Sequence, residues 1–502
     1  MVFMNIFMRI IGFAYDVYLS KLLGAEGMGL FQIGSSTLMT FLILTISGIP
    51  TAITKLVAEQ SSKNNNYNIE KIYKTAMIFN FSVSVVISVF VLLFSKFIAI
   101  KVFKNPEIIT GVYFLIPAII IISLSNILRS YFYGMKNMVI PSIAQLIEHS
   151  TRFIIVIGLL TYFAPVNPIY GGMIAIAGIS VGEFFDLLWC LFSKKYLIKN
   201  KSDVISNKQS SITFLAKILT IALPFTFSGF FNSILRFANT ILIPNRLMAS
   251  GYTSSKAIAA FGRIHGMTMP LIFLPFTVTS ALVINLIPSL SEQKALKMHR
   301  QIKEDIKLSI KVTLLISIPL TAIYVLLSKP IAIFLFNDPI VARYIHFMGY
   351  GTVLMALQHT LSGILYGLNK QINAVFHDMI GMIIRVALIY VLVGNPRFGI
   401  DGFFIAFLVT LVITTILDIS TLARITKFNF KYFDIIGKPI IGSAFMIGVV
   451  YISSYDLQNL QNTNPIAFLS SLLVGAVSYI FILVITRAIP ANFIGKIIKS
   501  AR

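Results

Sequence analysis

Long apolar segments recur along the whole chain and decide what it can fold into. A helix needs about 20 mostly apolar residues to cross the hydrocarbon core of a bilayer, and about fourteen segments reach that length. Backbone groups inside a bilayer must be hydrogen-bonded internally, so such segments fold as helices. We predict an all-α integral membrane protein with transmembrane helices near 1–22, 31–56, 75–97, 108–132, 140–163, 170–192, 212–245, 264–290, 309–335, 341–368, 374–394, 399–423, 435–455 and 465–487.

The composition agrees with a membrane protein and argues against a soluble one. Hydrophobic residues make up 57% of the 502 residues and charged residues only 12%, whereas soluble domains carry roughly 25% charged residues. The net charge of +23 would suggest nucleic acid in a soluble protein. Here the basic residues lie mainly between the apolar segments, so we expect membrane lipid and no nucleic acid as a partner.

The basic residues also predict an orientation. Lys and Arg gather in the cytoplasmic loops of membrane proteins. If the N-terminus is cytoplasmic, the two strongly basic stretches 193–217 and 291–311 fall on the inside, together with the C-terminal tail. The loop 96–104, with three lysines, goes against the rule. We expect a multi-pass protein of the cytoplasmic (cell) membrane with both termini inside.

The chain resembles itself at an offset of 233 residues. Lys96–Ile100 recurs as Lys329–Ile333, and Arg152 recurs as Arg385, with no gap between these anchors. Parallel repeats of this kind build two lobes with a central site that is reached from either side by rocking. We predict an N-lobe of helices 1–6, a basic cytoplasmic linker, a C-lobe of helices 7–12, and helices 13–14 with a basic tail, at 1–192, 193–211, 212–425 and 426–502.

Charged residues inside the apolar segments mark the expected functional site. A charge at mid-bilayer costs roughly 2.5–3.5 kcal/mol on insertion scales. The first, second, seventh and eighth predicted helices each present a polar face with a basic residue. We interpret these faces as a hydrated cationic cavity that binds phosphate, because a guanidinium can hold two oxygens at once. The alternative is that the cations reach the interface or pair with local carboxylates. The candidate residues are Arg9, Asp16, Lys55, Asn232, Arg236 and Arg263.

A second polar set lies on the fifth, sixth, eleventh and twelfth predicted helices. Glu148 and Arg152 are four residues apart and predict an ion pair within one helix. We favour a structural role for this set, which also includes Glu183, Asp186 and Asp418. The alternative is an ion-coupling site around Asp378, since carboxylates within membranes serve proton and sodium relays.

Motifs for catalysis are absent from the sequence. It contains no Walker loop, HExxH, CxxC or GxSxG, and its six histidines do not pair with Cys190 or a carboxylate at metal-ligand spacing. We therefore expect a transporter rather than an enzyme, with no cofactor and no metal. Its driving force would be a gradient, for example of Na⁺ or H⁺, the membrane potential or the substrate itself, unless a partner supplies an ATPase.

The first predicted helix carries a recognisable pattern. The stretch Arg9-Ile-Ile-Gly-Phe-Ala-Tyr-Asp16 resembles the first helix of the lipid II flippases, which belong to the multidrug/oligosaccharidyl-lipid/polysaccharide exporter superfamily. The stretches Gly24–Gln32, Ser47–Pro50 and Lys55–Glu59 resemble the stage V sporulation protein B and polysaccharide biosynthesis branch. Further similar stretches are Phe261–Arg263, Leu274–Phe276 and Ile287–Glu292.

The resemblance implies a flippase working by alternating access. Its substrate would be an undecaprenyl-pyrophosphate-linked glycan, lipid II first, moved across the cytoplasmic membrane for cell-wall or spore-cortex synthesis, with cell-wall synthesis proteins as partners. The family's essential cations on the first and eighth helices correspond to Arg9 and Arg263. The chain departs from the family at Tyr15, where a second arginine is common. It also lacks the arginines late in the second helix, where Lys55 is the nearest substitute.

Three other functions stay open. The first is a flippase for another lipid-linked polysaccharide unit, which needs the same cations. The second is a cation-coupled multidrug antiporter, which would favour an acidic cavity instead. The third is a scaffold for membrane assembly, which would tolerate loss of the buried arginines.

Overall fold

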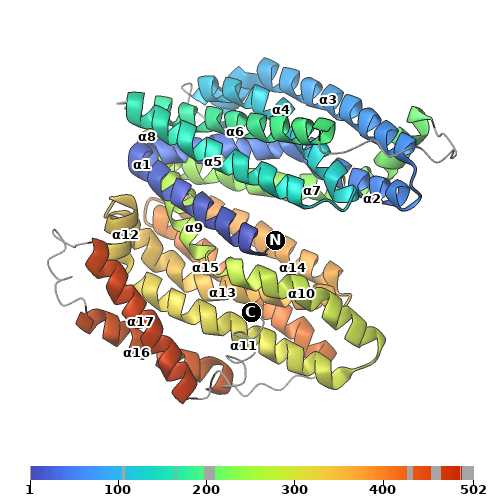
Figure 1. Cartoon of the computed structure of the whole chain (residues 1–502). Helices are drawn as coiled ribbons and strands as arrows, with labels where there is room; N and C mark the ends of the chain where they lie inside the picture. Colours follow the sequence, from blue (N-terminus) through green and yellow to red (C-terminus); the bar gives the residue numbers. More distant parts are fainter. Residues whose placement is uncertain are drawn as a thin grey trace. The chain divides into compact units, whose positions relative to one another are not determined.

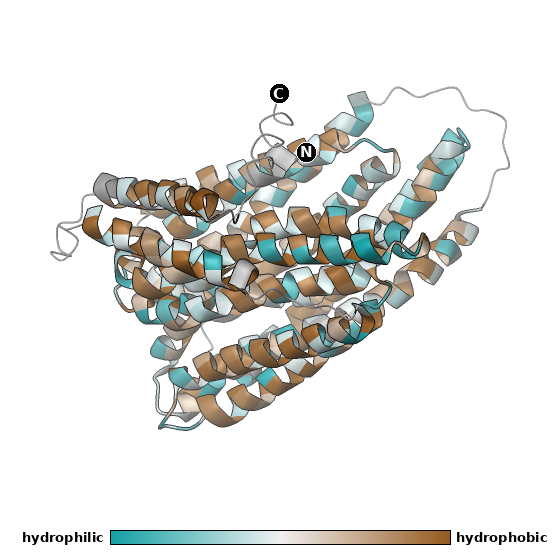
Figure 2. Ribbon diagram, turned by 90° about the horizontal axis from the view of Figure 1, so that it is seen from below, coloured by the Kyte–Doolittle hydropathy of each residue, from teal (hydrophilic) through white to brown (hydrophobic). Residues whose placement is uncertain are grey.

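A computed structural model describes residues 2–103, 108–163, 167–196, 210–426, 433–453, 465–486 and 488. These residues form helices joined by short turns and contain no strand (Figure 1). Figure 2 shows apolar residues along most of the length of these helices. The predicted all-α membrane architecture is confirmed.

The number of membrane-spanning helices depends on how broken helices are counted. Within the described residues, ten helices are long and apolar enough to cross a membrane, or eleven if the bent pair Ser254–Ile272 and Phe276–Ala295 is one span. About fourteen were expected. One of the ten, Phe7–Ser62, covers most of the first predicted span and all of the second. The long helices Ser211–Ala249 and Val341–Gly367 cover two more predicted spans without being among the ten.

The helices pack as two compact units. Unit 1 comprises Met1–Gly266 with Gly394–Arg397, and unit 2 comprises Met267–Val393 with Phe398–Arg502. The repeat instead predicts a division at 193–211, and most of that stretch lies outside the described residues. A repeat concerns sequence and a packing unit concerns contacts, so the division into two six-helix lobes stays a prediction.

Unit 1 begins with a helix that a single glycine divides. Gly24 has φ 65° and ψ −176° inside the first helix, a conformation that is open to glycine because it lacks a Cβ. The chain turns there, which separates the first predicted span from the second. The helices of unit 1 are α1 (Val2–Ile46), α2 (Ile49–Ser62), α3 (Asn66–Phe97), α4 (Ile108–Gly134), α5 (Val139–Phe163), α6 (Pro168–Tyr196), α7 (Ser211–Ala249) and α8 (Ser254–Gly262), with the π-helical turns η1 (Ile98–Val102) and η2 (Arg263–Thr268).

The core of unit 1 joins α2, α3, α4 and the start of α7. Ile53, Phe132 and Phe214 are fully buried in one apolar cluster. The opposite face of α3 is different: Ile78, Val86 and Leu93 are about two-thirds exposed and recur every seven or eight residues. That spacing places them on one side of the helix, as expected of a surface that meets lipid.

Unit 2 contains a bend at a proline and an apolar core. Pro275 is the N-cap of α10 and lies at a bend of 57°. Proline favours such a bend because it donates no backbone hydrogen bond and crowds the preceding turn. The core gathers Leu290, Ile306 and Ile364. The helices are α9 (Met269–Ile272), α10 (Phe276–Ala295), α11 (His299–Leu326), α12 (Ser328–Phe336), α13 (Val341–Gly367), α14 (Gln371–Leu388), α15 (Ile400–Thr426), α16 (Lys438–Ser453) and α17 (Pro465–Ile485), with η3 (Ile389–Val393) and η4 (Phe433–Gly437).

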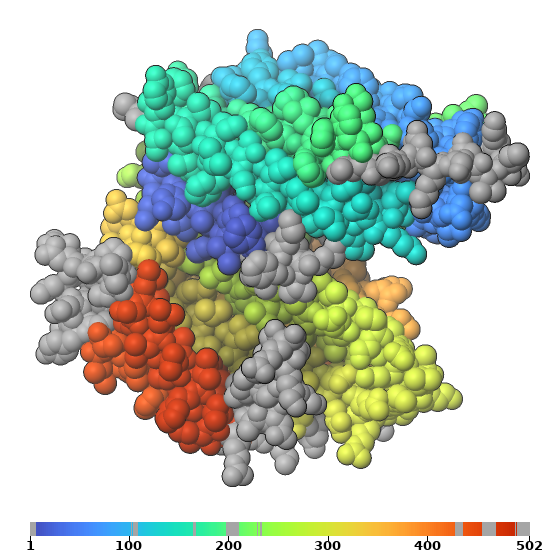
Figure 3. Space-filling view, in the orientation of Figure 1, coloured from blue at the N-terminus to red at the C-terminus, as the bar shows by residue number. Residues whose placement is uncertain are grey.

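The last two helices form a pair on the surface of unit 2. Helices α16 and α17 pack against each other, and α16 packs on α11. The Tyr479 hydroxyl donates to the backbone oxygen of Leu315 at 2.8 Å. Their outer side stays apolar and exposed at Ile452, Leu473 and Val477. Figure 3 shows this pair as the red part of the surface.

Candidate functional site

The first part of α1 carries two of the candidate residues. Arg9 is exposed, whereas Asp16 is half-buried and lies in the electrostatic range of Arg152 on α5. The ring of Phe153 on α5 contacts the ring of Tyr15, with centroids 6.2 Å apart. In the structure, α1 therefore contacts α5 near Asp16. Arg9, seven residues earlier, is exposed.

Three further cations lie on neighbouring helices of unit 1. Lys55 on α2 and Arg236 on α7 are exposed, and Arg263 is half-buried at the first position of η2. Helix α7 packs against α1, α2 and α8. Among the described residues, neither Lys55 nor Arg236 makes an ion pair. The side chain of Asn232, on α7, lies outside the described ones.

A polar seam joins α1, and the turn that follows it, to α7. The hydroxyls of Ser36 and Thr240 are 2.7 Å apart, and Ser47 donates to the backbone oxygen of Phe225 at 3.0 Å. A Cβ on Gly48 would stand 2.1 Å from the backbone oxygen of Ala222. Hydroxyls and small residues let membrane helices approach closely, so part of the polar face predicted on the second span serves helix packing.

A buried ionic cluster in unit 1 was not predicted as a whole. Arg129 on α4 donates to Asp186 and Glu183 on α6, at 2.7 and 2.8 Å, and to Glu148 on α5 at 3.1 Å. The predicted ion pair between Glu148 and Arg152 is confirmed. Glu183 and Asp186 also pair as expected of a structural set. Sequence reasoning missed Arg129, although a lone arginine in an apolar span, with carboxylates on the next two spans, was a usable signal.

The cluster leaves little reason to invoke a metal. Its three carboxylates have oxygens within 4.8 Å of one another, a spacing that suits a cation. The guanidinium of Arg129 already donates to all three. The cation required by these buried carboxylates is thus supplied by the chain.

Unit 2 carries the candidate for ion coupling. Asp378 on α14 is exposed and accepts a hydrogen bond from Gln358 on α13 at 2.7 Å. The residue before it is buried: His377 lies 2.7 Å from a carboxylate oxygen of Asp418 on α15. Arg385, further along α14, donates to Thr410 at 3.1 Å. Asp418 was expected to pair structurally, and its pairing with His377 was not foreseen.

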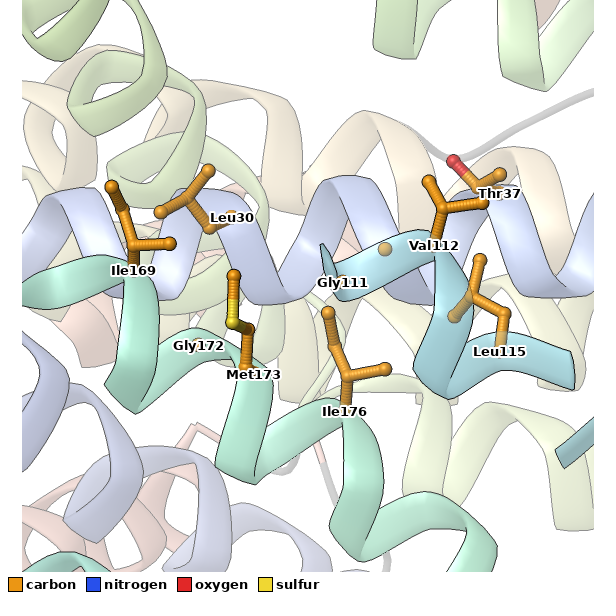
Figure 4. Close-up of a pocket in the computed structure, with 10 residues that line it drawn as sticks. Leu30, Thr37, Gly111, Val112, Leu115, Ile169, Gly172, Met173 and Ile176 are labelled. Carbon is orange, nitrogen blue, oxygen red and sulfur yellow. The ribbon is translucent and has the colours of Figure 1, made fainter. Parts of the chain in front are cut away.

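A small apolar cavity lies elsewhere in unit 1, between α1, α4 and α6. Its volume is about 20 Å³, room for about one water. Figure 4 shows Leu30, Ile176 and Leu115 pointing into it, with Thr37 at one end. A cavity of this size and polarity is unsuited to a charged head group.

Two family models match the chain. The polysaccharide biosynthesis protein family matches residues 1–294, and the MatE family matches residues 238–391. The chain is 26% identical to stage V sporulation protein B of Bacillus subtilis (strain 168) over 426 residues, which are 84% of this chain and 82% of that protein. It is 23% identical to the lipid II flippase MurJ of the same organism over 410 residues, 76% of this chain and 74% of that protein.

A solved structure extends the likeness to the fold. The lipid II flippase MurJ in an inward closed conformation matches with a TM-score of 0.72 and 16% identity, over 97% of this chain and 98% of that one. The fold is that of the multidrug/oligosaccharidyl-lipid/polysaccharide exporter superfamily, and the activities named among these relatives are not enzymatic. The resemblance drawn from the first two spans is confirmed. Because its model covers more than half of the sequence, the chain belongs to the polysaccharide biosynthesis protein family.

Proposed function

We propose that this protein is a flippase that moves a polyprenyl-pyrophosphate-linked saccharide across the cytoplasmic membrane by alternating access. Lipid II is the first candidate substrate. The observation that carries the proposal is the set of four basic side chains, Arg9, Lys55, Arg236 and Arg263, on neighbouring elements of unit 1. An anionic head group is the cargo that such a set would attract.

The energetic argument starts from the cost of charge in an apolar helix. A cation retained in a membrane segment faces water or an anion, because hydrocarbon solvates it poorly. Lys55 and Arg236 make no ion pair within the described residues. A pyrophosphate offers several anionic oxygens, and a guanidinium can bind two of them in one plane. Asp16, Asn232 and Arg263 would then complete the polar lining.

The apolar pair α16–α17 fits the same substrate. Its exposed residues Ile452, Leu473 and Val477 offer a surface for a polyprenyl chain that stays in lipid. The head group would cross along the cations while the tail remains outside. In this proposal both termini are cytoplasmic, as the basic loops predict.

The relatives support lipid II and leave a second candidate. One relative is named a lipid II flippase, and another a sporulation protein. The family name refers to polysaccharide biosynthesis, which favours a flippase for another lipid-linked polysaccharide unit as the alternative. Mass spectrometry of lipid that copurifies with the protein would separate the two. A mass other than that of lipid II would favour the alternative.

The cation set is tested by translocation of fluorescent lipid II in proteoliposomes. We expect Arg9→Ala and Arg263→Ala each to lower the rate at least about tenfold, since a hydrogen bond to a charged group contributes about 1.5–3 kcal/mol. Arg300→Ala is the matched control, because Arg300 is exposed and paired with Glu304 on α11. Wild-type rates for both variants, with intact membrane insertion, would refute the cationic site.

The role of Asp378 in ion coupling also stays a prediction. Asp378→Asn should change how the translocation rate depends on sodium or on pH. Asp401→Asn is a suitable control, because Asp401 is a half-exposed carboxylate of the same unit that is paired with Arg343. An unchanged ion dependence would leave Asp378 with its hydrogen bond from Gln358 as its role.

A further inference from the structure

A histidine–aspartate pair is buried in unit 2, between α14 and α15. The side chains of His377 and Asp418 are 9% and 1% exposed, and their Nδ1 and Oδ1 atoms are 2.7 Å apart. The second carboxylate oxygen of Asp418 is buried and has no hydrogen-bond partner among the described residues. Ser362 on α13 is a polar neighbour of this carboxylate. A buried carboxylate is costly unless a neighbouring group offsets its charge, and the ring of His377 is the titratable group that contacts it.

We propose that His377 and Asp418 together form a proton-binding site that couples unit 2 to the proton gradient. Its role in coupling rests on the flippase function proposed above. The binding of the proton itself does not. The site differs from the one predicted around Asp378, because the titrating ring is on the preceding residue and the buried carboxylate is on another helix.

The local geometry accommodates the pair with and without the proton. In the neutral ring, Nδ1–H donates to Asp418, and Nε2 can accept from the Thr421 hydroxyl, 3.5 Å away. When a proton adds to Nε2, that nitrogen becomes a donor to the same hydroxyl. The carboxylate then faces an imidazolium. The pair changes from a net charge of −1 to neutral, and no side chain has to change its neighbours.

Burial makes this change in charge energetically important. A net charge is expensive in a low-dielectric interior, whereas a hydrogen-bonded ion pair is much less so. One proton therefore removes the net charge of the pair. Histidine is the side chain whose charge changes in the range of cellular pH. The buried carboxylate of Asp418 thus contacts His377, the side chain that can neutralise its charge.

Charged and titratable groups on the packed helices act on the pair in both directions. Asp378 on α14 exerts a negative field on Asp418, and Tyr366 on α13 lies within the field of both carboxylates. A second carboxylate nearby favours uptake of a proton. The guanidinium of Arg385, about two turns along α14 and hydrogen-bonded to Thr410, acts against that uptake. The neighbour η3 adds Tyr390, exposed at the far end of α14.

Proton binding can be measured without any transport assay. The full-length protein, with ¹⁵N-labelled histidine and in lipid nanodiscs, would be titrated by NMR from about pH 5 to pH 9. His377→Gln assigns the signal of His377 by its loss. We expect that signal to change from a neutral to a doubly protonated ring. In Asp418→Asn the imidazolium loses its ion-pair partner, so the transition should move about one to three pH units lower.

His346 provides a matched control on α13. Its Nδ1 lies 2.8 Å from the backbone oxygen of Val325 rather than from a carboxylate. The signal lost in His346→Gln should not move in Asp418→Asn. If the His377 signal stays neutral over the whole range, the site does not bind a proton. If its transition does not move in Asp418→Asn, Asp418 is not part of the site, and the proposed pair is refuted.

Transport then tests the coupling. At a fixed membrane potential, removal of the pH gradient should change the wild-type translocation rate several-fold and leave the rate of His377→Gln unchanged. A rate of His377→Gln that still follows the pH gradient would overturn the coupling role, as would a wild-type rate that follows sodium alone. Loss of the Arg9 and Arg263 effects would instead remove the flippase proposal, and it would leave the NMR titration as it is.

Discussion

The two units carry buried charge on corresponding helices, and they balance it differently. In unit 1, α4, α5 and α6 surround Arg129 with three carboxylates. In unit 2, α13, α14 and α15 hold His377 and Asp418. At the repeat offset of 233, the position of Arg129 corresponds to Ser362, which neighbours Asp418. At this aligned position, unit 1 thus has a permanently charged arginine, and unit 2 has a small, uncharged serine.

The difference concerns what pH can change. A guanidinium stays charged at any pH a cell reaches, whereas an imidazole gains and loses its charge near neutrality. Unit 1 therefore holds three helices together with a cation that cannot be titrated away. Unit 2 depends on a proton for the same neutralisation. We infer that the charge of the unit 1 cluster is fixed at any cellular pH, whereas the charge of the unit 2 pair changes with pH.

The largest effect is expected from removing the fixed cation. Arg129→Gln leaves three carboxylates buried against one another and should destabilise unit 1 by about 3–5 kcal/mol. Trp189 on α6 is the single tryptophan of the chain, so its fluorescence during thermal unfolding reports on unit 1. Arg300→Gln, at an exposed pair, is the control. A near-normal unfolding temperature would mean that Arg129 does not hold α4, α5 and α6 together.

The next effect should come from the pair of His377 and Asp418. His377→Gln removes the ring that faces the buried carboxylate and should destabilise the protein by about 1–3 kcal/mol, measured by circular dichroism during heating. The wild-type advantage should grow at lower pH, where the ring is charged and paired with Asp418. An advantage that stays constant from about pH 5 to pH 8 would remove the contrast with unit 1.

A smaller effect is expected when one carboxylate of the cluster is neutralised. The three carboxylates face two guanidiniums, Arg129 and Arg152, so Glu183→Gln makes the cluster formally neutral. An amide oxygen can still accept from Arg129 and Ser125. We expect a loss of about 1 kcal/mol or less by Trp189 fluorescence. A loss as large as that of Arg129→Gln would show that geometry, rather than charge balance, holds the cluster.

The smallest effect should come from an exposed ion pair of unit 2. Arg343 on α13 donates to both oxygens of Asp401 on α15, at 2.6 and 2.7 Å, and both side chains are about half exposed. Arg343→Gln should cost about 0–1 kcal/mol by circular dichroism, because exposed pairs contribute little. A cost comparable to that of His377→Gln would mean that α13 and α15 are joined at their ends rather than at the buried pair.

Local spacing was enough to predict part of this arrangement. The pair Glu148–Arg152 follows from a separation of four residues on one helix, and the structure contains it. Arg129 and Glu183 are 54 residues apart, and His377 and Asp418 are 41 apart. No helical period links such positions. Their contacts depend on which helices pack together and on how each is rotated about its axis.

The sequence alone determined that this protein lies in a lipid bilayer and that its fold is all-α. Runs of apolar residues must be helical in a bilayer because no water is present to satisfy their backbone, and this holds whatever the helices pack against. Tertiary structure alone decided the partners of the buried charges. A cation in an apolar span needs a neighbour, but only the packing of α4 on α5 and α6 gives Arg129 its carboxylates. Likewise, only the packing of α14 on α15 sets His377 against Asp418.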